Sequence, residues 1–157
     1  LIVAFSTSSS AATLPVSMRT ADEILKVRNG TSSFVLPLGA TMNMDGTALF
    51  EAVAAVFLAY LFDVPLGPAG IVLVFLMSMV ASIGAPGMPS GSMAGMQLVL
   101  LSVGIPLEAI AILLVIERPL DTIRTSINVE GDLVGALVVD ELTAEHDSTD
   151  QAQVDVR

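Results

Sequence analysis

The feature that most constrains this chain is the near absence of charge through its middle. Between Arg28 and Arg118 there is no lysine or arginine. The acidic residues of that stretch are Asp45, Glu51, Asp63, Glu108 and Glu117. Charged residues make up 14% of the whole chain, against about 25% in an ordinary soluble domain. Because a soluble domain needs charge all along its surface, this region predicts a lipid environment.

The formal net charge of −10 comes largely from the C-terminal end, where residues 140–157 are acidic and poor in aromatic residues. We expect this end to be a disordered tail. The rest of the chain has no basic patch suited to nucleic acid. Without cysteine there is no disulfide, thiolate metal site or cysteine nucleophile.

The N-terminal run from Leu1 to Phe5 has no initiator methionine and no charged residue. It does not match a signal peptide. It is typical of an apolar segment already under way, so we expect the chain to be a fragment of a longer protein.

Polar or Gly/Pro tracts interrupt the apolar segments at three places, residues 6–10, 41–47 and 84–91. Interruptions of this kind are typical of discontinuous helices in secondary transporters. Irregular backbone at membrane depth is tolerated only where it is buried in protein or lines a watery cavity. We therefore predict an all-α membrane protein with two re-entrant helical hairpins and two discontinuous transmembrane helices.

The predicted membrane part covers residues 1–139, followed by the tail. It divides into a first hairpin tip and second arm at 1–28, a broken helix at 31–62, a second hairpin at 69–103 and a last helix at 106–139. Arg19, Lys26 and Arg28 share one short connector, which the positive-inside rule puts in the cytoplasm. Following the crossings from there leaves the C-terminal tail cytoplasmic as well.

A polar stripe marks the last predicted helix. Its members are Glu117, Asp121, Arg124, Asn128 and Asp132, spaced by four, three, four and four residues. This spacing puts them within roughly an 80° arc of one helix face. Ionisable residues inside a membrane helix are costly and by default functional. The alternative is an amphipathic helix outside the membrane, against which the apolar run 133–139 counts.

Each interruption has a functional and a purely structural interpretation. Asn43, Asp45 and Thr47 are compatible with an Asx turn or with oxygen ligands for a small cation. The serines at 6–10 are compatible with small-residue helix packing or with holding a carboxylate at a helix N-terminus. Residues 84–91 are compatible with a passive loop or a gate.

Together these motifs resemble one family in order and spacing. Asn43-Met44-Asp45-Gly46-Thr47 matches the NMDGT signature of the dicarboxylate/amino acid:cation (sodium) symporter family, which includes the glutamate transporters. Ser8-Ser9-Ser10 resembles the tip of its first hairpin and residues 84–91 the tip of its second. The polar stripe is similar to its final helix. The resemblance covers residues 4–139 and implies a C-terminal transport-domain fragment without the scaffold helices.

The resemblance implies a substrate site between the two hairpin tips. Its residues would be Ser10, Thr47, Met88 (through its backbone), Asp121, Arg124, Thr125 and Asn128. Arg124 would pair with the substrate's side-chain carboxylate, which a planar bidentate donor suits. Asp121 would take the amino group.

The resemblance also implies three sodium sites and no further cofactor. The first would combine Asp132 with carbonyls of Gly39, Asn43 and Asn128. The second would use Asp45 and the Asn43 side chain. The third would use carbonyls of Thr41, Ser82, Ile83 and Ala85. Because the ligands come from both the helix break and the gate, ion binding would be coupled to gate closure.

Glu51 lies four residues after Thr47 and stands where animal glutamate transporters carry an acid tied to proton coupling. Proton co-transport is therefore one interpretation, and an acid with a structural partner is the other. Archaeal and animal members carry an extra arginine where this chain has Ser8 and Thr122, and Glu117 replaces the usual aspartate. These departures leave the choice of substrate open.

We therefore expect a sodium-coupled symporter for glutamate or aspartate, a multi-pass homotrimer in the plasma or inner membrane. A symporter for C4-dicarboxylates and an inactive structural fragment are the alternatives. A hydrolase using Ser10 and His146 is excluded, because the only histidine lies in the tail beyond the last span. We do not expect an enzyme.

Overall fold

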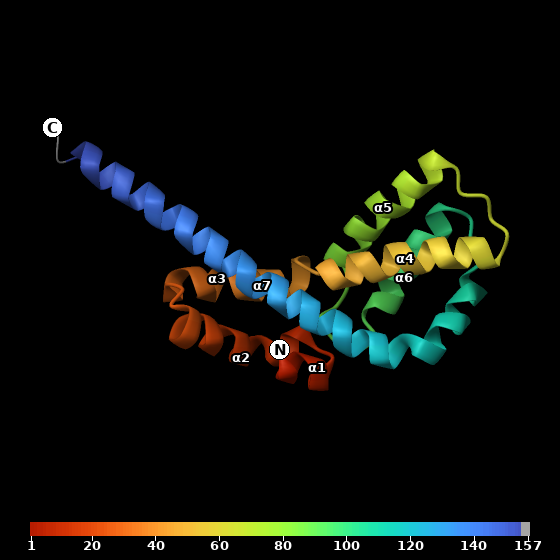
Figure 1. Cartoon of the computed structure of the whole chain (residues 1–157), viewed down its shortest axis with the longest axis horizontal. Helices are drawn as coiled ribbons and strands as arrows, with labels where there is room; N and C mark the ends of the chain where they lie inside the picture. Colours follow the sequence, from red (N-terminus) through yellow and green to blue (C-terminus); the bar gives the residue numbers. More distant parts are fainter. Residues whose placement is uncertain (155–157) are drawn as a thin grey trace.

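The computed structural model describes the backbone of residues 1–154 and the side chains of residues 1–144. Every regular element in that part of the chain is helical, as expected (Figure 1). The elements are α1 (Ile2–Thr7), α2 (Ser10–Thr20), η1 (Ala21–Leu25), α3 (Asn29–Met42), α4 (Asp45–Leu61), α5 (Pro68–Ile83), α6 (Ser92–Ser102), η2 (Leu107–Ala109) and α7 (Ile110–Val154).

The serine run forms the turn between α1 and α2. Ser8 ends α1 in the left-handed region, with φ 50°. Ser9 then caps α2, because its side chain accepts a hydrogen bond from the Ala12 N–H at 3.1 Å. A serine in this position satisfies one of the free N–H groups at the start of a helix.

The predicted break in the second segment is present and short. Asn43 and Met44 leave the helical region, with ψ values of 74° and 63°. Helix α3 therefore ends at Met42, and α4 begins at Asp45 after a gap of two residues. The Asn43 N–H still donates to the Gly39 carbonyl at 2.8 Å, and the Ala48 N–H donates to Met44 at 2.9 Å.

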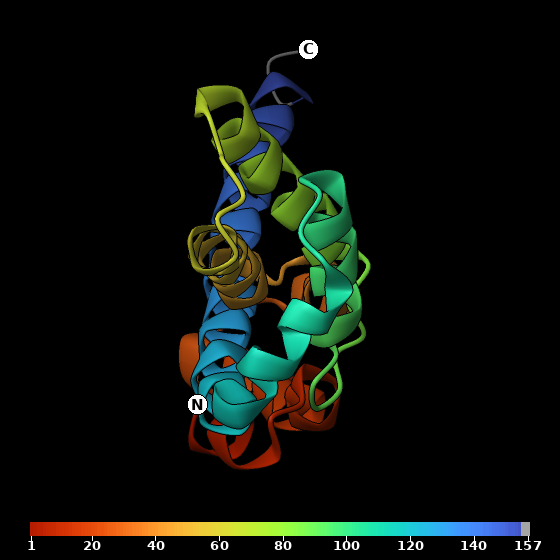
Figure 2. The same cartoon turned by 90° about the vertical axis from the view of Figure 1, so that its right-hand side faces the viewer.

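Helices α5 and α6 form a pair joined by residues 84–91, whose Gly and Pro content prevents continued helix. They pack with α4 around a core that includes Leu58, Val74, Met96 and Leu100. Figure 2 shows the connecting loop reaching the N-terminal helices, far from the opposite end of the α5–α6 pair. This packing brings the loop beside the serine turn.

Helix α7 differs from expectation in two ways. It is one continuous helix and not a discontinuous one, with Pro119 inside it. The bend in its first, teal part (Figure 1) is explained by proline, which kinks a helix without ending it here. The helix also continues to Val154 where we expected a disordered tail, since residues 136–154 contain no glycine or proline to stop it.

Large apolar side chains cover much of the outer surface. Phe34, Tyr60 and Val115 are 70%, 85% and 83% exposed. Residues Asn29–Leu61, which include the break, are long and apolar enough to cross a membrane. The outside of the molecule therefore offers apolar surface to lipid or to further protein.

Candidate functional site

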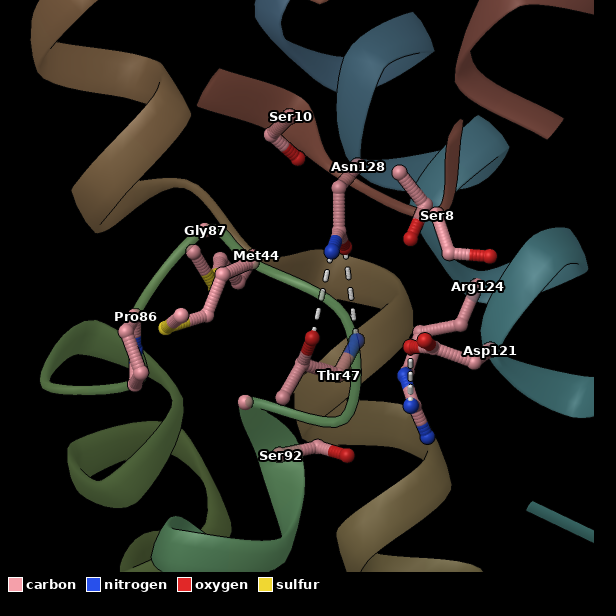
Figure 3. A pocket seen from close by; sticks show the side chains of 13 residues that line it. Ser8, Ser10, Met44, Thr47, Pro86, Gly87, Ser92, Asp121, Arg124 and Asn128 are labelled. Carbon is pink, nitrogen blue, oxygen red and sulfur yellow. Dashed lines mark hydrogen bonds and ion pairs between the residues drawn. The ribbon is translucent and has the colours of Figure 1, made fainter. Parts of the chain in front are cut away.

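A small cavity lies where the serine turn, the α3–α4 break, the 84–91 loop and α7 meet (Figure 3). All seven residues predicted to bind substrate line it: Ser10, Thr47, Met88, Asp121, Arg124, Thr125 and Asn128. Its volume is about 10 Å³, roughly room for one water. A larger ligand therefore needs the surrounding segments to move.

The polar stripe of α7 is buried, as predicted. Arg124 is 4% exposed and Asp121 3%. One terminal nitrogen of Arg124, Nη2, donates to Glu117 Oε1 at 2.9 Å and also to Asp121 Oδ1. The guanidinium lies over the Phe50 ring, with Cζ 4.4 Å from the ring centroid. Two carboxylates and an aromatic face thus hold this cation in place.

The other terminal nitrogen of Arg124, Nη1, is buried without a hydrogen-bond partner among the described residues, and so is Glu117 Oε2. A buried donor left unpaired costs free energy. Arg124 therefore has one strong donor available for a ligand carboxylate.

Asn128 bridges α7 to the start of α4. Its side-chain oxygen accepts hydrogen bonds from the Gly46 and Thr47 N–H groups at 2.8 and 3.3 Å. Its amide nitrogen donates to Thr47 Oγ1 at 3.1 Å. Both N–H groups belong to the first turn of a helix and have no partner within it. Asn128 therefore stabilises the break through its side chain.

The serine turn and the 84–91 loop are in direct contact. The Gly87 carbonyl accepts hydrogen bonds from Ser9 Oγ at 2.7 Å and from the Ala11 N–H at 3.2 Å. The Ser90 N–H donates to Asp121 Oδ2 at 3.0 Å. The loop is thus tied on one side to the serine turn and on the other to the polar stripe.

A second cluster of oxygen atoms lies between α3 and α7, where Gly39, Asn43, Asp45 and Asp132 line one groove. The Asn43 amide lies between the two carboxylates. In one orientation it donates to Asp132 Oδ1 at 3.3 Å, and in the flipped orientation it donates to Asp45 Oδ1 at 3.0 Å. Carboxylate and amide oxygens of this kind suit a hard cation such as sodium.

Comparison with known proteins identifies the family. Residues 1–142 match the model of the sodium:dicarboxylate symporter family. The chain belongs to the sodium:dicarboxylate symporter family. The resemblance inferred from the NMDGT motif and the polar stripe is thereby confirmed.

Several transporters are similar to this symporter-family chain. Human excitatory amino acid transporter 3 is 46% identical over 143 residues, which are 91% of this chain and 27% of the relative. Human excitatory amino acid transporter 2 is 49% identical over 88% of this chain and 24% of its own length. A Caenorhabditis elegans excitatory amino acid transporter is 48% identical over 88% and 27%. The chain spans about a quarter of the length of these curated relatives.

Glu51, the residue predicted for proton coupling, is fully buried in this symporter-family chain. Neither carboxyl oxygen has a hydrogen-bond partner in the part of the chain whose side chains the structure describes. A Cβ built on Gly95 of α6 would collide with Glu51 Oε1, so α6 packs directly on this carboxyl group. Proton coupling and pairing with a structural partner both stay predictions for Glu51.

At the third predicted ion site, the structure shows hydrogen bonds made within single helices or at a helix end. Thr41 Oγ1 donates to the Leu38 carbonyl, and Ser82 Oγ donates to Met79, each within its own helix. The Ser82 carbonyl accepts the Ala85 N–H at 3.2 Å. A site built from carbonyls of Thr41, Ser82, Ile83 and Ala85 stays a prediction.

Some cavity residues of this symporter-family chain were not predicted: Ser8, Met44, Pro86, Gly87, Gly91 and Ser92. All lie within the three interruptions or, for Ser92, directly after one of them, and that position was the only signal in the sequence. His146 lies in the part of α7 whose side chains the structure does not describe.

Proposed function

We propose that this chain is the substrate- and ion-binding part of a secondary active symporter that moves an acidic amino acid together with sodium. The observation that carries the proposal is the cavity, where all seven predicted substrate residues meet between two tips and a helix break. No covalent chemistry is involved. The protein contributes binding, and conformational change carries the cargo.

The charged groups of the cavity suit glutamate or aspartate. Arg124 Nη1 has no hydrogen-bond partner within residues 1–144, so it is available for the side-chain carboxylate of the substrate. Asp121 carries the opposite charge on the same helix face and would hold the ammonium group. Thr47, Thr125 and Asn128 add neutral polar groups. A substrate with carboxylates and an ammonium group satisfies both kinds of charge.

Sodium would bind beside this cavity as a second cargo. Asp45, Asn43 and Asp132 form one cluster with Gly39, and Asn128 reaches from α7 to the N–H groups that follow Asp45. Ion binding that orders the break would therefore also order Thr47 in the substrate cavity. Such a linkage couples the two ligands thermodynamically. Glu51 would add a proton as a further coupling ion.

The protein would lie in the plasma or inner membrane as a multi-pass homotrimer. The exposed apolar surface and the span Asn29–Leu61 support a bilayer environment. The α1–α2 turn and residues 84–91 between α5 and α6 would be the tips of two re-entrant hairpins, with α3–α4 as a discontinuous transmembrane helix. Arg19, Lys26 and Arg28 favour a cytoplasmic location for their connector and for the C-terminal end.

A C4-dicarboxylate is the second candidate substrate, because the family description names dicarboxylates. Asp121 argues against it, since a carboxylate beside a second substrate carboxylate would repel it. The relatives described above are named as excitatory amino acid transporters, which favours the amino acid.

Uptake into proteoliposomes tests this function directly. The complete protein that carries this sequence is reconstituted, and uptake of labelled aspartate, glutamate and succinate is measured with an inward sodium or choline gradient. We expect sodium-dependent uptake of the amino acids and little of succinate. Preferential uptake of succinate would favour the second candidate, and no uptake of any of the three would contradict the proposed function.

Substitution of Arg124 tests the proposed substrate site most directly. Arg124→Lys keeps the charge but loses the planar fork, so we expect acidic amino acid uptake to fall by about 100-fold, within the range of about 1.5–3 kcal/mol for a hydrogen bond to a charged group. Sodium-dependent thermal stabilisation should persist. Arg19→Lys, at an exposed arginine paired with Glu23, is the matched control. Uptake by Arg124→Lys equal to that of the wild type would contradict the assignment.

A further inference from the structure

Arg118 stands at the edge of the polar stripe and has no role in the cavity itself. Its side chain is 71% exposed, and Nη1 lies 3.9 Å from Asp121 Oδ2. Exposed pairs at this distance contribute little to stability. If Arg118 has a role, it must therefore come from the electric field of its charge and not from the stability of its ion pair with Asp121.

The buried charges beside the cavity do not balance. Glu117 and Asp121 carry two formal negative charges, and Arg124 between them carries one positive charge. These three groups leave a net charge of −1 next to the cavity that would receive an anionic substrate. In a medium of low dielectric constant such a charge acts over several ångströms.

Arg118 supplies the missing positive charge. Between Arg28 and Arg124 it is the only lysine or arginine in the sequence. Its exposed side chain lies beside Asp121, whose Oδ2 also accepts the Ser90 N–H from the 84–91 loop. The cation therefore stands beside the loop that covers the cavity, where an approaching anion would meet it first.

We propose that Arg118 is a specificity-determining residue that neutralises the excess negative charge at the mouth of the cavity and attracts anionic substrates to it. This inference rests on the proposed function, because it requires an anionic cargo. The substrate class is small carboxylates with a net negative charge. Arg118 acts on the approach of the substrate, whereas Arg124 holds it.

The test is the initial rate of labelled aspartate uptake by proteoliposomes of the complete protein, as a function of aspartate concentration. In Arg118→Gln we expect KM to rise about tenfold, at the low end of electrostatic steering effects, with Vmax within about twofold of the wild type. Arg118→Lys should keep the wild-type KM. Arg19→Gln, which removes an exposed arginine from a distant helix end, is the charge-matched control and should also keep it.

Ionic strength separates an electrostatic role from a structural one. Sodium is held constant and choline chloride is raised equally on both sides of the membrane, which shortens the Debye length from about 10 Å at 0.1 M to about 3 Å at 1 M. The KM difference between wild type and Arg118→Gln should then shrink to less than about twofold. An unchanged KM in Arg118→Gln, or a difference that does not depend on salt, overturns the inference. Absence of aspartate uptake by the wild type overturns the proposed function, and this inference with it.

Discussion

Two glycines bring helix backbone close to the carboxylates of the ion cluster, Asp45 and Asp132. A Cβ built on Gly39 would lie 2.5 Å from Asp132 Oδ1, and one built on Gly131 would lie 2.7 Å from Asp45 Oδ2. Real Cβ atoms do not come this close to an oxygen. At these two positions only glycine lets a helix backbone reach the carboxylate, which is what carbonyl and carboxylate ligands of one cation require.

Gly39→Ala should therefore disturb the ion cluster while leaving the helix intact. The added methyl group displaces the Asp132 carboxylate, so we expect the sodium concentration for half-maximal aspartate uptake to rise about threefold to tenfold, or about 0.7–1.4 kcal/mol. Sodium titration of uptake in proteoliposomes measures it.

Gly30→Ala in the same helix is the control for this change, because nothing lies within 4 Å of a Cβ there. It should leave the sodium dependence unchanged, since alanine is the better helix former. A normal sodium dependence in Gly39→Ala would show that Asp132 is not an ion ligand at this position.

At the scale of the elements, the α3–α4 break is stabilised by a neighbouring helix. The first N–H groups of α4 at Gly46 and Thr47 receive their acceptor from Asn128 of α7. A Cβ on Gly46 would lie 2.7 Å from the Arg124 carbonyl, so the two backbones are in close contact. The start of α4 and the polar stripe therefore form one unit.

Asn128→Ala should loosen this unit. It leaves two N–H groups and the Thr47 hydroxyl without their partner, each costing about 1 kcal/mol or more. We expect a fall in Tm of about 5 °C or more in detergent, measured by circular dichroism or by dye-free scanning fluorimetry of the complete protein.

Ser126→Ala is the matched substitution, since Ser126 Oγ donates only to Thr122 of its own helix. Its Tm should stay near that of the wild type. Equal Tm values for Asn128→Ala and Ser126→Ala would mean that Asn128 does not stabilise the break.

At the scale of the whole molecule, the N-terminal connector is tied to the far part of α7. Arg28 Nε donates to Asp140 Oδ1 at 2.8 Å, and Arg28 Nη2 donates to the Asp140 carbonyl at 2.8 Å. Thr31 Oγ1 also donates to Asp140 Oδ1 at 2.8 Å. Residues more than a hundred positions apart thus join α3 to α7 at the end opposite the α5–α6 pair.

The hydrogen bond from Arg28 holds the pKa of Asp140 below its ordinary value of 3.8, and the bond from Thr31 adds to this. Because the folded-state pKa is depressed, the stabilisation is fully present above pH 3.8 and is lost as the pH falls through the lower folded value. We therefore expect hydrogen exchange near Thr31 and Asp140 to be slower in the wild type than in Asp140→Asn at pH 5. The two proteins should converge at strongly acidic pH. A constant difference across this pH range would assign the effect to something other than ionisation of Asp140.

The sequence predicted more of the site than of the helix boundaries. Uncharged apolar segments and their three interruptions were sufficient for an all-helical fold, because both depend on local composition. The α7 stripe was also readable, since helical spacing fixes which side chains share a face. The continuous course of α7 past Pro119 and on to Val154 was missed, because a proline or a polar composition weakens a helix without always ending it.

The sequence alone thus determined which residues are polar within apolar segments, and how they are spaced along each helix. Only the tertiary structure decided how they pair: that one nitrogen of Arg124 faces Glu117 and Asp121 while the other has no partner, and that Gly87 meets Ser9. Helical periodicity is a local property, whereas these contacts join segments that are distant in sequence. They depend on how the helices pack, which no spacing within one segment specifies.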